Sequence, residues 1–440
     1  MNRPYRYCWH HFIWRWCYNL VLILLLPFGL AALLLKSDNT EGKRNKNIER
    51  FGFIGRPKHN GILIHCVSVG EVNAAKSIIQ RLQLSYPDVP ITISTTSTTG
   101  AKQAHAIFKD SVQHMYLAID IPVCMWLFFH KLRPKLVLVT EVEIWPNMLH
   151  QCYRRKIPAV LINARMSSES VKTYQNLAYL FRPSLRKFSR ICTQGQQDFE
   201  NFLSLGVYKP NLMQSNNMKF DLEADPQDEI KAEQLKLQLS LENQPVFVAG
   251  STHDLEEKAC LDAFKKLRVS HSQLLLIIVP RHPHRFEKVT QLCQATGYAV
   301  VKTSELDEEP LHVLPDIVVV DAMGMLKACY HLASFAFVGG SFAHKGGHNA
   351  LEPALYGVPT MMGPSIFNNP VICHALADAG GLKVLSQATQ LSETAGSWLN
   401  NPEEAISLGQ ASKKVIEQNR GAINQTLDVI AEVMEEGAPH

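Results

Sequence analysis

The sequence predicts an α/β protein with two doubly wound domains that face each other across a cleft, preceded by a membrane-anchor helix. Three observations predict this class. Short apolar runs rich in β-branched residues alternate with helical patterns, which is typical of parallel sheets covered by helices. A polar, acidic stretch at 221–244 interrupts the alternation once and indicates a domain boundary. An uncharged run near the N-terminus is about long enough to cross a bilayer.

Residues 1–36 form the predicted membrane anchor. The run at 20–35 carries no charge, and aromatic residues lie where it would meet the membrane–water interface. Basic residues precede and follow the run: Arg3, Arg6 and Arg15, then Lys36, Lys43, Arg44, Lys46 and Arg50. The downstream side is the more basic, which places the main body in the cytoplasm. The alternatives are a signal peptide cleaved near Gly29 and, because of Pro27, an interfacial or re-entrant helix.

The two domains are predicted at 37–220 and 221–420. Strands of the first are expected at 61–67, 90–94, 136–140, 159–162 and 191–193. Strands of the second are expected at 246–249, 274–279, 298–301, 317–320, 335–338 and 360–361. Helical spacing follows most of these runs. Residues 421–440 are predicted as a C-terminal helix, for which a crossing back to the first domain is one arrangement.

Composition excludes several classes of protein. The chain is 46% hydrophobic and 19% charged, which is globular rather than disordered. A formal net charge of +4 is too weak to indicate a nucleic-acid partner. The ten cysteines form no C-x-x-C pair, so they suit reduced thiols better than disulfides or a zinc site.

Polar residues follow three predicted strands of the first domain. Glu71 comes after the first, where it is either a general base or only a complement to the helix dipole, and position alone favours the dipole. Hydroxyls at 95–99 are either ligands for phosphate or sugar oxygens or helix caps. Glu141 and Glu143 follow the third, where they either bind a metal or have a sugar-binding or structural role, and the absence of a neighbouring histidine or aspartate pair favours the latter. The basic segment 154–190 is either a solvated face or a surface for anionic lipid headgroups.

The second domain has a glycine-rich segment at 337–359. Gly339-Gly340 and Gly346-Gly347 allow backbone N–H groups to approach a ligand, and a helix is predicted to start behind them. This pattern predicts a phosphate and sugar cradle, although Asn349 and Glu352 alone also fit a capping box. Polar residues follow three other predicted strands, at 250–253, 280–283 and 321–324. Four such strand ends in one domain favour a ligand site.

Ten segments in order resemble the 3-deoxy-D-manno-octulosonic acid (Kdo) transferases of lipopolysaccharide assembly. They are HCVSVGEV, STTSTTGA, TEVEIWPN, INARMS, NMKFD, GSTHDLEE, PRHPHRF, DAMG, VGGSFAHKGGHNALEP and the anchor. The resemblance implies a GT-B type fold of two Rossmann-like domains at the cytoplasmic face of a bacterial inner membrane. It implies inverting transfer from CMP-Kdo to the lipid A precursor lipid IVA, with Glu71 as general base. The sequence has no evident metal-binding pair of aspartates, so the transfer is predicted to need no metal, and no cofactor is expected. The family often has glutamate where this chain has Met325.

The predicted site residues follow from these segments. Glu71 is the catalytic residue. Donor binding is assigned to Ser251, Thr252, His253, Arg281, His282, Met323, Gly324, Gly339, Gly340, Ser341, Gly347, His348, Asn349 and Glu352. Acceptor binding is assigned to Ser68, Gly70, Thr98, Gly100, Glu143, Arg165 and Lys219. The alternatives are another GT-B glycosyltransferase, a sugar-nucleotide epimerase, or a membrane-tethered protein that binds lipid or nucleotide without catalysis.

Overall fold

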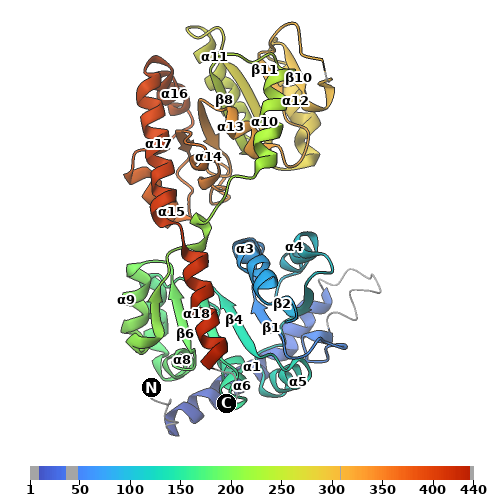
Figure 1. The fold of residues 1–440 in the computed structure, drawn as a ribbon, viewed down its shortest axis with the longest axis vertical. Coiled ribbons are helices and arrows are strands. Elements are labelled where there is room, and N and C mark those ends of the chain that lie inside the picture. Colours follow the sequence, from blue (N-terminus) through green and yellow to red (C-terminus); the bar gives the residue numbers. More distant parts are fainter. Residues whose placement is uncertain (1–8, 36–47, 308, 437–440) are drawn as a thin grey trace. The chain divides into compact units, whose positions relative to one another are not determined.

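The computed structural model describes residues 9–35, 48–307 and 309–436; for residues 10 and 29–35 it describes the backbone alone. Of the charges used above to orient the anchor, Arg3, Arg6, Lys36, Lys43, Arg44 and Lys46 lie outside the described residues. The chain divides into two compact units (Figure 1). Unit 1 comprises 1–221 and 420–440, and unit 2 comprises 222–419.

Unit 1 is built on a parallel sheet with strand order β3-β2-β1-β4-β5-β6-β7. Its strands are β1 (Ile62–His65), β2 (Ile91–Thr95), β3 (Gln113–Tyr116), β4 (Leu136–Thr140), β5 (Ala159–Ala164), β6 (Arg190–Thr193) and β7 (Leu212–Gln214). The central strands are buried throughout and rich in β-branched residues, as strands covered on both faces require. The order reverses at β1, so the ends of β1 and β4 open a crevice where such sheets bind ligands.

Unit 2 is built on a second parallel sheet, with strand order β10-β11-β9-β8-β12-β13-β14. Its strands are β8 (Val246–Thr252), β9 (Leu275–Pro280), β10 (Val300–Lys302), β11 (Ile317–Val319), β12 (Phe335–Val338), β13 (Thr360–Met362) and β14 (Leu382–Val384). The pair β8 and β12 lies at the reversal of the order. Two doubly wound parallel α/β domains confirm the predicted fold class.

Helices cover both sheets. Those of unit 1 are α1 (Trp9–Leu35), α3 (Val69–Ser85), α4 (Thr98–Phe108), α5 (Pro122–Leu132), α6 (Pro146–Arg154), α7 (Ser168–Asn176), α8 (Ala178–Leu185), α9 (Gln196–Ser204) and α18 (Ala422–Glu436). Those of unit 2 are α10 (Pro226–Gln238), α11 (Glu256–Arg268), α12 (Phe286–Gln294), α13 (Leu326–Leu332), α14 (Leu351–Leu355), α15 (Pro370–Asp378), α16 (Gln390–Asn400) and α17 (Pro402–Asn419).

Helix α1 is docked on unit 1 by polar contacts near its N-terminal half. The Tyr18 hydroxyl donates to Asp120 Oδ2 at 3.0 Å, and Asn147 Nδ2 donates to Asn19 Oδ1 at 2.7 Å. Trp14 stacks on Tyr179 of α8 with ring centroids 5.8 Å apart. The segment 11–28 is long and apolar enough to cross a membrane, with a mean hydropathy of 1.4. Its large apolar side chains are mostly exposed.

Helix α18 belongs to unit 1, although it is more than 200 residues distant from that unit's last strand in sequence. Figure 1 shows it lying along the sheet of unit 1. Its apolar face, including Ile423, Val429 and Ile430, joins the core formed by β1, β4 and α3. The Asp221 carboxylate caps its first turn by accepting from the N–H groups of Gly421 at 2.6 Å and Ile423.

Candidate active site

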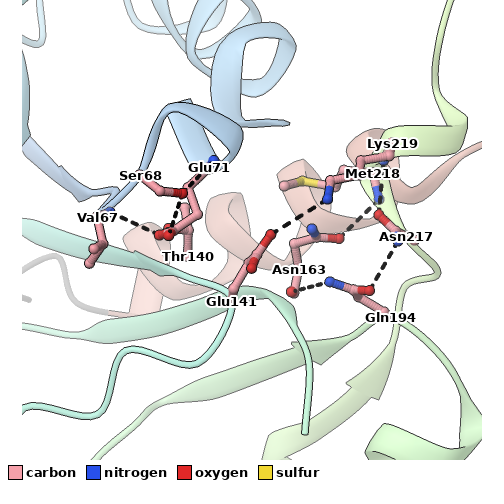
Figure 2. Close-up of polar contacts among 10 residues, drawn as sticks. All are labelled: Val67, Ser68, Glu71, Thr140, Glu141, Asn163, Gln194, Asn217, Met218 and Lys219. Atoms are coloured by element: carbon pink, nitrogen blue, oxygen red, sulfur yellow. Dashed lines mark hydrogen bonds and ion pairs between the residues drawn. The ribbon is translucent and has the colours of Figure 1, made fainter. Parts of the chain in front are cut away.

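The carboxyl edge of the first sheet holds Glu71 in a fixed position. Ser68 caps helix α3 by accepting from the Glu71 N–H at 3.3 Å, so the glutamate lies in the first turn. Its carboxylate accepts from the Val67 N–H at 2.9 Å and the Ser68 hydroxyl at 3.0 Å, and from Thr140 Oγ1 on β4 at 2.6 Å (Figure 2). These donors hold the Glu71 carboxylate in one orientation.

Two further carboxylates follow β4 at the same edge. Glu141 has a positive φ of 55°, which turns the chain sharply after the strand, and its carboxylate lies 3.8 Å from Lys219 Nζ. Burial raises the pKa of Glu141, and Lys219 opposes the shift. Burial, then the charge of Glu71, raises the pKa of Glu143 to about 7. Three carboxyl groups thus lie at one sheet edge, and raised pKa values of this kind are frequent at functional sites.

A network of amide side chains places Lys219 beside Glu141 (Figure 2). Asn163, near the end of β5 and with a φ of 51°, accepts from the Met218 N–H at 3.0 Å. Gln194 donates to the Asn163 carbonyl at 2.9 Å and accepts from Asn217 Nδ2 at 3.0 Å. Asn217 in turn caps the short helix Met218–Phe220 by accepting from the Lys219 N–H.

The other predicted acceptor residues divide between exposed positions and the core. Ser68, Gly70 and Thr98 are exposed. Gly100 is buried in the first turn of α4, where a Cβ atom would lie 2.9 Å from Ser97 Oγ and 3.2 Å from the Val67 carbonyl oxygen. Arg165 is half-buried behind Glu141. Gly100 therefore allows α4 to pack closely on the segment between β1 and α3, which precedes Glu71.

The glycine-rich segment of unit 2 is closed by internal hydrogen bonds. The N–H groups of Gly340, Ser341, Phe342 and Ala343 donate to the carboxylate of Glu256, at 2.8 to 3.2 Å. The N–H groups of Gly347 and His348 donate to the carbonyl oxygens of Gly340 and Gly339, both at 3.0 Å. The expectation of an open cradle of free N–H groups is therefore wrong. Donor binding by these residues stays a prediction, through other atoms.

The glycines have a packing role instead. A Cβ atom on Gly339 would lie 2.3 Å from the Ser251 carbonyl oxygen. Gly340 has a φ of 74°, and a Cβ atom there would lie 2.9 Å from the His348 ring. These two positions bring the loop against the end of β8 and against a histidine, which a larger residue would prevent.

Four histidines gather beside this loop: His253, His282, His284 and His348. The Nε2 atoms of His253 and His348 are 2.8 Å apart, and their rings stack at 5.1 Å. Burial and the nearby Arg281 guanidinium lower the pKa of His348 to about 4, so this ring is neutral at pH 7. Arg281 and His282 are exposed at the end of β9. The described residues contain no group of three or more histidine, cysteine or acidic side chains arranged to hold a metal ion.

The remaining predicted donor residues serve partly structural roles. Asn349 Oδ1 accepts from the Leu351 N–H at 3.2 Å, and its amide donates to Glu352 at 3.5 Å. Helix α14 behind them has five residues, so it adds little dipole. Ser251 has a φ of 53° at the irregular end of β8, and Thr252 is fully buried. Met323 and Gly324 are exposed.

Comparisons with known proteins identify the family. The model of the 3-deoxy-D-manno-octulosonic acid transferase family matches residues 45–222. The 3-deoxy-D-manno-octulosonic acid transferase of Haemophilus influenzae is 35% identical over 96% of this chain and 99% of its own length. The chain belongs to the Kdo transferase family. It is therefore a glycosyltransferase, and the transferase of Rickettsia bellii is a more distant relative, 27% identical over 94% of this chain and 98% of its own.

One solved structure supports the fold of this Kdo transferase. UDP-GlcNAc 2-epimerase from Neisseria meningitidis is similar over 84% of this chain and all of its own, with a TM-score of 0.55 and 11% identity, which concerns the fold alone. The C-terminal CMP-Kdo binding domain of WaaA from Acinetobacter baumannii is 34% identical over 44% of this chain and 99% of its own, with a TM-score of 0.41.

Sequence reasoning missed several residues that shape the two candidate sites. Asn163 lies near the end of β5, and Gln194 and Asn217 follow β6 and β7. The rule that polar strand ends mark a site would have found Asn163 and Gln194, whereas no strand was predicted before Asn217. Glu256 was not among the predicted site residues. Its carboxylate lies against a loop 84 positions further along, and no local pattern indicates such a contact.

Proposed function

We propose that the protein is an inverting glycosyltransferase that moves Kdo from CMP-Kdo to the lipid A precursor lipid IVA, with Glu71 as general base. Membership of the Kdo transferase family supports Kdo as the sugar that is transferred. The observation that supports Glu71 as the base is the fixed position of its carboxylate. Three donors hold it at the sheet edge where doubly wound domains bind ligands. A base needs a fixed lone pair within reach of the proton that it removes.

The reaction is a single displacement. Glu71 takes the proton of an acceptor hydroxyl as that oxygen attacks the anomeric carbon of Kdo. The bond from this carbon to the phosphate oxygen breaks, and CMP leaves with the electron pair. Attack opposite the leaving group inverts the anomeric configuration. The exposed guanidinium of Arg281 is our candidate for stabilising the phosphate charge, because it stays ionised and donates bidentate hydrogen bonds.

The acceptor would be held by charges of both signs around Glu71. Lys219 and Arg165 can meet the phosphates of lipid IVA, whereas Glu143 can accept hydrogen bonds from sugar hydroxyls. Ser68, Gly70 and Thr98 are exposed at the same strand ends, where a sugar can reach them.

A glutamine at position 71 tests the proposal. Glu71→Gln keeps the side-chain volume and one acceptor oxygen, but the base is lost. The cap of α3 stays in place, because Ser68 accepts from the backbone N–H of residue 71 and not from its side chain. We expect kcat for Kdo transfer to lipid IVA to fall by roughly 10²- to 10⁴-fold, measured by mass spectrometry of the lipid product. Asp221→Asn is the matched control, because it also removes a carboxylate that accepts backbone N–H groups in unit 1. Full activity of Glu71→Gln would remove Glu71 from the mechanism.

The same assay separates the alternatives. A transferase or epimerase with another donor would consume a UDP-sugar and leave CMP-Kdo intact. A protein that only binds lipid or nucleotide would convert neither. Product mass also reports how many Kdo residues are added to each acceptor.

We also infer that unit 1 binds the cytoplasmic face of the bacterial inner membrane. Beside the exposed apolar face of α1, the side chains of Val123, Trp126 and Tyr179 are exposed. A groove between α1, α5 and α6 is lined by Trp16 and Trp126 together with the basic residues Arg15 and Arg154. Tryptophan and arginine side by side suit the level of anionic lipid headgroups.

A further inference from the structure

Glu256 is a fully buried carboxylate in the first turn of helix α11. Among the described residues, its two oxygens accept five backbone N–H groups. Oε2 accepts from His253 at 3.0 Å and Gly340 at 2.8 Å. Oε1 accepts from Ser341 at 3.0 Å, Phe342 at 2.9 Å and Ala343 at 3.2 Å. Its exposed fraction is 0%, so no solvent shares these donors.

Consecutive backbone N–H groups that converge on one point form an anion site. In this protein the anion is part of the chain. The carboxylate occupies the position that a phosphate would take if the loop were an open cradle. Displacing it would leave a buried, unpaired charge, which is strongly unfavourable. A ligand phosphate therefore cannot use these N–H groups.

The same carboxylate ties the loop to the histidine cluster. Oε2 joins the end of β8, through His253, to the start of the loop, through Gly340. Gly340 approaches the His348 ring so closely that a Cβ atom would lie 2.9 Å from it. The Nε2 atoms of His253 and His348 are themselves 2.8 Å apart. The positions of both rings thus depend on Glu256, although Glu256 cannot touch a ligand.

We propose that Glu256 is a positioning residue for the donor: it fills the anion site of the loop 340–343 and thereby fixes His253 and His348, so that side chains and not loop N–H groups meet the donor phosphate. This rests on the proposed function, in which CMP-Kdo binds unit 2. A residue that only stabilised the fold would change the melting temperature without a selective effect on the donor.

Substitution of neighbouring glutamates tests this role. Glu256→Gln keeps one oxygen but turns an NH2 group toward N–H donors, and Glu256→Ala removes all five acceptor contacts. Glu257→Gln is the matched control, because Glu257 is equally buried on the same helix but binds Arg285, at 3.1 Å. We expect at least a tenfold rise in KM for CMP-Kdo with Glu256→Gln, a larger rise with Glu256→Ala, a smaller change in kcat, and no change in KM with Glu257→Gln.

Hydrogen exchange gives a readout that needs no substrate. The N–H groups of 340–343 should lose protection in Glu256→Gln and keep it in Glu257→Gln. The CMP affinity, measured by calorimetry, should fall with the same variant. If Glu256→Ala fails to fold, the KM and the hydrogen exchange of Glu256→Gln alone test the proposal. Equal KM values for Glu256→Gln and the wild type, or equal shifts for both Gln variants, would overturn the proposal.

The two proposals fail in different ways. If the wild type transferred no Kdo, the proposed function would fall, whereas exchange of the loop N–H groups and the CMP titration would still report on Glu256. If the wild type transferred Kdo and Glu256→Gln matched it in KM and exchange, only the role of Glu256 would fall.

Discussion

An alanine at position 340 would perturb the donor loop at its tightest point. Gly340 has a φ of 74°, a conformation that costs an L-residue roughly 1–2 kcal/mol. The new Cβ would also lie 2.9 Å from Cδ2 and 3.0 Å from Nε2 of His348, so the ring must move. Moving it breaks the His253–His348 hydrogen bond, worth about 1 kcal/mol. We expect the free energy of unfolding to fall by roughly 2–3 kcal/mol in total.

Gly297 provides the matched control for this prediction. Its φ is 80°, and a Cβ atom there would meet nothing within 4 Å. Gly297→Ala should therefore lose only the backbone part, roughly 1–2 kcal/mol. For a unit of this size each kcal/mol lowers Tm by about 2–4 °C, so calorimetry can separate the two variants. Gly340→Ala should also raise KM for CMP-Kdo, and Gly297→Ala should not. Equal losses of stability would refute the close approach of Gly340 to His348.

Two further predictions concern unit 1. Burial raises the pKa of Asp120 to about 7, so the folded state holds a proton that the unfolded state releases near pH 4. The contribution of this group to the free energy of unfolding is full below about pH 4 and is lost as the pH rises to 7. Between pH 5 and 7 the free energy of unfolding of the wild type, measured with urea, should therefore fall by roughly 2 kcal/mol relative to that of Asp120→Asn. A difference between the two proteins that stays constant with pH would contradict this. Arg154→Gln should lower the partition coefficient of the protein into vesicles that contain anionic phospholipid roughly fivefold, and should not change its partition into neutral vesicles. An equal decrease for both kinds of vesicle would contradict a contact between Arg154 and anionic headgroups.

The fold was largely predictable because the sheets are buried on both faces. Their central strands, such as 136–140 and 335–338, are continuous apolar runs that differ plainly from the helices between them. The strand Gln113–Tyr116 was missed because its first residues are polar, which an edge strand tolerates. The strand Leu382–Val384 is short and also lies at an edge. Local sequence therefore predicts central strands better than edges.

The candidate site was predictable only where the chemistry is local. Ser68 and Glu71 are three residues apart, so the sequence itself indicates both the helix cap and a carboxylate at the strand end. The glycine loop was interpreted wrongly because its pattern indicates free N–H groups but not what occupies them. Glu256 fills them from a distant part of the chain, and only the fold brings the two together.

Helix α18 has a consequence for synthesis of the protein. Unit 1 takes part of its core from residues that the ribosome adds only after the whole of unit 2. Until then the groove that receives Ile423, Val429 and Ile430 is uncovered, and Asp221 has no N–H groups to cap. Unit 2 is contiguous in sequence and can complete its own core first. The first unit to emerge is therefore the last to be finished, and its apolar groove needs protection in the interval.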